Sequence, residues 1–292
     1  MSSDLAAFIT SWAWEPLILL PFLLLAALYA VGWRRLSRRE GWPMPAWWKP
    51  WCFGVGLLAL PVALLSPIGV FSELFFFLHM TQHMLLMVFA APLILLGSPV
   101  LPILWALPDR LRDLAVTLFS RGSPIAWVFN MLTHPLVALP LYIVALAVWH
   151  IPVFYDAAQG RTLIHDLEHM VFLGTALLFW WPVINPMGGP RRMGYLATIP
   201  YLLPPMLVGN LIGAVLTFAD HPLYDTYLKV PRLWGISVVQ DQQLGGLIMW
   251  VPGGMVYIVP ILVVVALLFK DEKVDQRRGI EADYRRREDT LG

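Results

Sequence analysis

The sequence predicts an all-α protein that crosses a membrane seven times. Of its 292 residues 59% are hydrophobic and only 13% are charged. The apolar residues form long blocks, and most charges lie in short connecting segments and near the C-terminus. A soluble domain of this length needs more charge to cover its surface, so we expect the lipid bilayer to be the solvent. A formal net charge of +1 gives no reason to expect nucleic acid as a partner.

Seven apolar stretches have the length of about 17 to 25 residues that a membrane-crossing helix needs. They cover residues 15–33, 51–69, 74–97, 135–151, 163–184, 195–217 and 243–269. We predict a transmembrane domain over residues 1–270 and a charged cytoplasmic tail over residues 271–292. Residues 98–122 are interrupted by prolines, so this segment is expected to lie at the inner interface or to re-enter the membrane as a half-helix.

The distribution of basic residues predicts the orientation. With seven spans and an outward N-terminus, the inner loops and the tail hold five, three, two and seven Lys and Arg residues, 17 of the 20. The outer side then holds only Arg161, Lys229 and Arg232. Cytoplasmic loops carry the excess of basic residues, so the N-terminus is expected outside and the C-terminus in the cytoplasm.

Two histidine pairs stand out within this topology. HMTQH contains His79 and His83 in the third span, and HDLEH contains His165 and His169 at the start of the fifth. Residues i and i+4 share one helix face, so each pair projects two imidazoles in the same direction. Two such helices facing each other could give four nitrogen ligands to one ion or to two neighbouring ions. Ionisable groups inside a span are costly and are candidates for function.

Further polar groups lie at the same predicted depth. His150 is at the outer end of the fourth span, and Asp241 enters the seventh span from the outside in VVQDQQLGGLIMW. Asp241 could be a ligand, a partner that fixes an imidazole tautomer, or a capping group at the start of a helix. Asp166 and Glu168 are interpreted mainly as charges favoured by the helix dipole, although one of them could orient a histidine.

The ligand types leave the metal open. Cys52 is the only cysteine, so a thiolate cluster within the chain is excluded. Histidine with nearby methionine and an outward position suits copper, but zinc binds the same imidazoles and haem can be held by two axial histidines.

Several motifs together resemble one known family. HMTQHMLLM followed by APLILLGSP, then WHIPVFYDAA, HDLEHMVFLGTALLFWWPV and DQQLGGLIMW, are similar to the CtaG-like family of cytochrome c oxidase assembly factors, over about residues 70–260. The resemblance implies a seven-helix protein of the bacterial plasma membrane that delivers copper to a haem-copper oxidase subunit. It also implies functional roles for matching positions, namely His79, His83, His150, His165, His169 and Asp241.

Other classes of protein remain possible from the sequence. A haem-binding membrane redox protein would use one axial histidine from each of two helices. HDLEH also fits H-x-x-E-H, in which Glu168 would be the general base of a zinc protease, but this leaves His79 and His83 without a role. A copper transporter would need ligands through the whole membrane, and the inner half offers mainly His134 and Cys52. We therefore expect a binding and delivery protein with its metal site near the outer face, not an enzyme.

Overall fold

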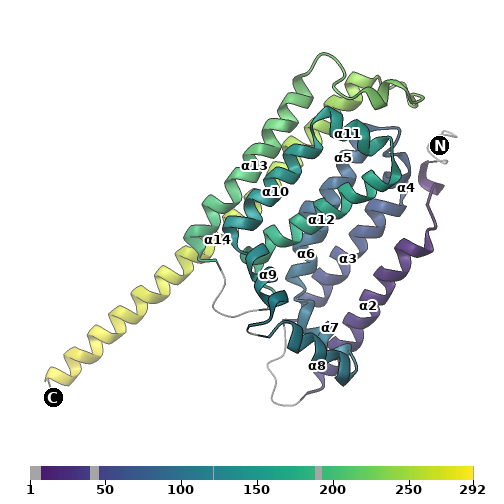
Figure 1. The fold of residues 1–292 in the computed structure, drawn as a ribbon. Helices are drawn as coiled ribbons and strands as arrows, with labels where there is room; N and C mark the ends of the chain where they lie inside the picture. The colour runs from purple at the N-terminus through teal and green to yellow at the C-terminus, as the bar shows by residue number, and fades with distance from the viewer. Residues whose placement is uncertain (1–7, 40–45, 121, 188–192, 292) are drawn as a thin grey trace.

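The computed structural model describes residues 8–39, 46–120, 122–187 and 193–291, the last stretch from residue 271 as helix backbone only. All regular elements in these ranges are helical (Figure 1). The described chain begins near α11 (Pro152–Gln159), and α14 (Val238–Leu291) projects from the opposite end of the bundle (Figure 1). The orientation of these two ends relative to the cell stays a prediction.

Six helical segments have the length and hydropathy of membrane spans. They are α2 (Pro16–Ser37), α3 with α4 (Lys49–Leu65, Pro67–Phe71), α5 through α6 (Phe76–Leu96), α12 (Thr162–Ile184), α13 (Tyr195–Phe218) and the part Val238–Lys270 of α14. These confirm six of the seven predicted spans as helices. The domain boundary predicted at residue 270 stays a prediction, because α14 continues through it to Leu291.

The predicted fourth span differs from a single straight helix. α10 (Pro135–Trp149) is only 15 residues long, and it reaches spanning length only together with α9 (Pro124–Leu132), to which it is bent by 63°. Proline at the first position of α10 cannot donate to the preceding turn, and Nδ1 of His134 accepts from the backbone N–H of Leu136 as the N-cap. The chain therefore restarts a helix at Pro135, and the count is six spans, or seven if this bent pair is one.

Residues 98–120 contain two short helices, α7 (Val100–Ala106) and α8 (Asp109–Leu118), at the end of the bundle away from α11 (Figure 1). α7 packs against α2 so closely that a Cβ on Gly32 would overlap the carbonyl of Pro102. The guanidinium of Arg35 donates to the carbonyls of Trp105 and Ala106, the last turn of α7. The segment thus packs against the end of α2, and its predicted position at the inner interface or as a re-entrant half-helix stays a prediction.

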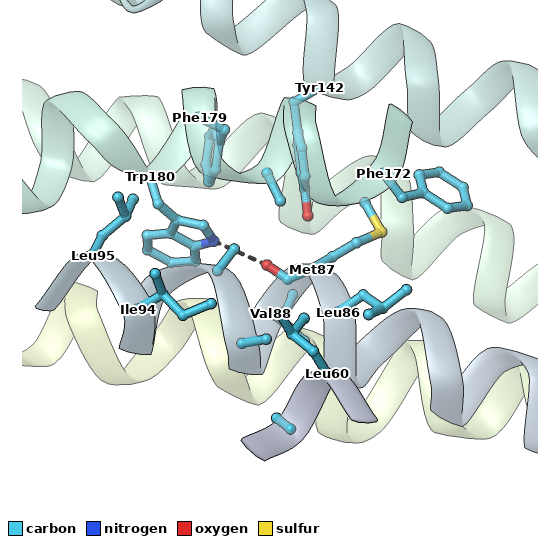
Figure 2. Packing of buried hydrophobic residues seen from close by; sticks show 14 of the residues in the cluster. Leu60, Leu86, Met87, Val88, Ile94, Leu95, Tyr142, Phe172, Phe179 and Trp180 are labelled. Atoms are coloured by element: carbon cyan, nitrogen blue, oxygen red, sulfur yellow. Dashed lines mark hydrogen bonds between the residues drawn. The ribbon is translucent and has the colours of Figure 1, made fainter. Parts of the chain in front are cut away.

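The core contains buried residues from the third span and α12 together with residues of α3, α10 and α13; Figure 2 shows the part between the third span and α12. Between α5 (Phe76–Met84) and α6 (Ala91–Leu96) the third span contains a π-helical turn, η1 (Leu85–Ala90). The indole N–H of Trp180 donates to the carbonyl of Met87 within this turn, over a distance of 3.3 Å (Figure 2). π-helical turns occur frequently at functional sites, and this one begins two residues after His83.

Candidate metal centre

The two histidine pairs meet between α5 and α12. Within α5 the ring centroids of His79 and His83 are 4.1 Å apart, and within α12 those of His165 and His169 are 4.3 Å apart. Across the helices, His79 lies 5.3 Å from His165, and His83 lies 5.4 Å from His169. The i, i+4 spacing on both helices therefore produces one compact group of four imidazoles, in which the pair on α5 lies opposite the pair on α12.

Glu168 lies inside this group. Its side chain is 1% exposed, and its two carboxylate oxygens lie 3.9 Å from Nε2 of His79 and 3.8 Å from Nε2 of His83. These three residues each offer one ligand atom within 4.8 Å of the others, a spacing that a bound metal ion could draw together. The interpretation of Glu168 as a helix-dipole charge is wrong, because the carboxylate is buried among the imidazoles.

His150 is a fifth, partly buried imidazole beside this group. Its Nδ1 lies 2.7 Å from the carbonyl of Leu146, which can only accept, so Nδ1 carries the proton. Nε2 then carries a free lone pair, and this atom is buried without a hydrogen-bond partner. A backbone carbonyl that fixes the tautomer in this way is a common feature of histidine metal ligands.

The group contains an unusual concentration of unpaired polar atoms. Within the described ranges, eight buried side-chain N and O atoms have no hydrogen-bond partner, and seven belong to five residues of this group: His83, His150, His165, Glu168 and His169. The eighth is Oε1 of Gln82, between the two histidines of α5. A buried unpaired polar atom costs about 1–3 kcal/mol, so native proteins contain few. Imidazole nitrogens and carboxylate oxygens are metal ligands, and this donor set fits a bound cation.

Asp241 caps the helix that carries His79 and His83. Its side chain is fully buried, and its two oxygens accept from the backbone N–H groups of Phe76 (3.0 Å) and Phe77 (2.9 Å) in the first turn of α5. Arg232 donates to the same carboxylate over 2.8 Å. Of the three interpretations of Asp241 from the sequence, the structure shows the capping one, at the start of α5 and not of its own helix. Its carboxylate is committed to protein donors.

The other two histidines lie apart from the site. His134 caps α10 toward the opposite end of the bundle, and His221 is exposed with its Nδ1 2.6 Å from the carboxylate of Asp220. That hydrogen bond lowers the pKa of the exposed Asp220 carboxyl. The histidine group therefore contains five of the seven histidines, at the end of the bundle formed by α11 and the start of α12 (Figure 1).

The chain is similar to uncharacterised proteins of three mycobacteria. It is 28% identical to one from Mycobacterium bovis and to one from Mycobacterium tuberculosis, over 96% of this chain and 43% of each relative. It is also 28% identical to one from Mycobacterium leprae, over 96% of this chain and 42% of that protein. The chain thus spans less than half the length of these relatives. No solved structure matches it.

A comparison with models of protein families gives more information than these uncharacterised relatives. Residues 27–271, which include all the helices that form the histidine group, match the family model described as cytochrome c oxidase caa3 assembly factor (Caa3_CtaG). This match covers most of the chain, and the protein therefore belongs to the Caa3_CtaG family of cytochrome c oxidase caa3 assembly factors.

Proposed function

We propose that this protein binds copper as cargo and delivers it to a subunit of a haem-copper oxidase during assembly. The observation that carries the proposal is the group of five histidines and Glu168: His79, His83 and Glu168 each offer a ligand atom within 4.8 Å of the others, and five residues of the group hold buried N or O atoms without a hydrogen-bond partner. His79, His83 and Glu168 are the proposed primary ligands, and His150, His165 and His169 supply further imidazoles. The proposed role is binding and transfer of the ion, without catalysis.

Copper is favoured by the ligand set together with the family. Imidazole nitrogen binds copper(II) more strongly than other divalent first-row ions, so a histidine group without thiolates retains copper against competitors. An oxidase with a copper centre needs a source of that ion, which supports copper over zinc. Zinc remains the second candidate, because it accepts the same mixed nitrogen and oxygen ligands.

The proposed position is the plasma membrane of a bacterium, with the metal group toward the outer face. Arg34, Arg35, Lys49 and Arg112 gather beside α7 and α8: Arg34 and Arg35 are in the last turn of α2, Arg35 and Arg112 contact Trp105, and Lys49 donates to Ser98. Basic residues favour the cytoplasmic side, so the histidines face outward under this assignment. An oxidase subunit would then dock on the outer segments 152–162 and 218–240.

Assembly of the oxidase in cells tests this function. In a strain without the wild-type protein, the His79→Ala, His83→Ala double variant is expressed in its place. Oxidase activity is expected to fall by at least about 90% relative to the wild-type strain, because the loss of two ligands weakens copper binding by well over tenfold. The matched control is His134→Ala, which removes a histidine outside the group. Full oxidase activity with the double variant, at equal protein levels, would contradict the proposal.

A further inference from the structure

The short helix α11 connects the histidine group to the segment 219–237 between α13 and α14. The amide nitrogen of Gln159, the last residue of α11, lies 2.7 Å from Nδ1 and 3.4 Å from Nε2 of His79. The amide oxygen and nitrogen of glutamine can be interchanged without changing its shape. In the interchanged orientation Gln159 accepts from Nδ1–H, and Nε2 of His79 keeps its lone pair on the side of Glu168, 3.9 Å away.

We propose that Gln159 is a positioning residue for the metal ligand His79, and that α11 makes this ligand responsive to a protein docked on segment 219–237. The inference rests on the proposed function, since it describes how the same site holds and releases its ion. A hydrogen bond to the second ring nitrogen fixes the tautomer and the orientation of a histidine ligand, and its loss typically weakens metal binding by about 10–100-fold.

The same helix is bonded to segment 219–237 on its other side. The carboxylate of Asp156 accepts from the backbone N–H groups of Asp225 (3.4 Å) and Thr226 (3.1 Å) in η2 (Asp225–Leu228). The hydroxyls of Tyr155 and Tyr227 are 2.8 Å apart, and burial raises the pKa of both phenols, so both stay neutral hydrogen-bonding groups. A movement of η2 is thus transmitted directly to α11.

Segment 219–237 also contacts the residues just before α5, the helix that carries His79. Arg232 donates to the carbonyl of Leu74 over 3.1 Å and to Asp241, the cap of α5. The ring of Trp234 stacks on Phe75, with centroids 4.7 Å apart. His79 is therefore held in two ways, by its helix α5 and by the hydrogen bond between its ring and Gln159. Both are connected to segment 219–237.

The segment is accessible to a partner. Leu228, Leu233 and Trp234 on it are exposed apolar side chains. An oxidase subunit that covers these side chains and displaces η2 would shift Asp156 and Tyr155, which contact η2. Because Gln159 is on the same helix α11, it would move with them. Loss of the Gln159 hydrogen bond frees the His79 ring to turn, which weakens the site at the moment when the acceptor is present.

Metal dissociation from purified full-length variants tests both parts of this link. Gln159→Leu is expected to raise the Kd for copper by about 10–100-fold with unchanged stoichiometry and unchanged thermal unfolding. Gln159→Glu is expected to restore tight binding, because a carboxylate also accepts from Nδ1–H. Asp156→Ala removes the two hydrogen bonds to the backbone of η2, keeps the contact between Tyr155 and Tyr227, and removes no contact with an imidazole; it is expected to raise the dissociation rate severalfold. Asp220→Asn is the control, since this exposed carboxylate in the same segment is bonded to the neighbouring exposed His221.

The outcomes separate the claims. Equal Kd values for the wild type and Gln159→Leu, or a failure of Gln159→Glu to restore binding, would overturn the positioning role. A dissociation rate for Asp156→Ala equal to that of Asp220→Asn would overturn the link to segment 219–237. A wild-type protein that binds no metal would overturn the proposed function, and this inference with it.

Discussion

Replacement of Glu168 by glutamine is expected to stabilise the metal-free protein and to abolish tight metal binding. Both carboxylate oxygens are buried without a hydrogen-bond partner within the described part of the chain. A neutral amide of the same shape removes the cost of a buried unpaired charge, so the free energy of unfolding should rise by about 1–3 kcal/mol. The amide is also a poor metal ligand, and the Kd for copper should rise by at least about 100-fold.

Thermal unfolding and metal titration of the purified variant measure these opposite effects. Asp166→Asn is the matched control, because Asp166 is on the same helix but exposed, and it should change neither quantity. Lower stability of metal-free Glu168→Gln, combined with unchanged copper affinity, would show that the carboxylate supports the fold instead of binding a cation. Such an exchange of stability for binding is typical of functional sites.

Replacement of Asp241 by alanine is expected to produce the largest loss of stability, about 3–5 kcal/mol. The change leaves Arg232 without its buried partner and exposes two N–H groups of α5 to an apolar environment. Asp241→Asn keeps an acceptor for one N–H group and should lose less. Denaturation of the detergent-solubilised variants, followed by helix content, gives the difference in free energy.

The asparagine variant also separates capping from metal binding. Because the carboxylate of Asp241 is occupied by Phe76, Phe77 and Arg232, folded Asp241→Asn is expected to bind the same number of copper ions as the wild type. Asp225→Ala, which removes an acidic side chain at η2, is the stability control. A loss of one copper equivalent in folded Asp241→Asn would return Asp241 to the set of ligands.

The helices and the histidine pairs were predictable because they depend on local periodicity. Long apolar blocks indicate spans, and i, i+4 spacing places His79 with His83 and His165 with His169 on common faces. The bend between α9 and α10 is less evident from the sequence. In THPLVALP one proline, Pro135, stands at the break, and the effect of Pro135 depends on the cap that His134 provides. The sequence therefore indicates where helices form better than where they change direction.

The remaining parts of the site depend on contacts between distant residues. Asp241 caps a helix that begins 165 residues earlier, and Gln159 meets a histidine 80 residues before it. Such pairings are set by tertiary packing and leave no local pattern. Glu168 is different, because its position in HDLEH places it next to His169 and three residues after His165, on the buried side of α12. The H-x-x-E-H spacing was the available signal for it.

Metal content and the optical spectrum of the purified protein test the central claim most directly. The comparison is with a variant in which His79, His83, His165 and His169 are all changed to alanine. The account predicts bound copper in the wild type, no haem absorption, and loss of the copper in a folded variant. Haem absorption that disappears in the variant would contradict the copper assignment, and absence of both metal and haem from the wild type, with oxidase assembly unaffected by the variant, would contradict the metal site itself.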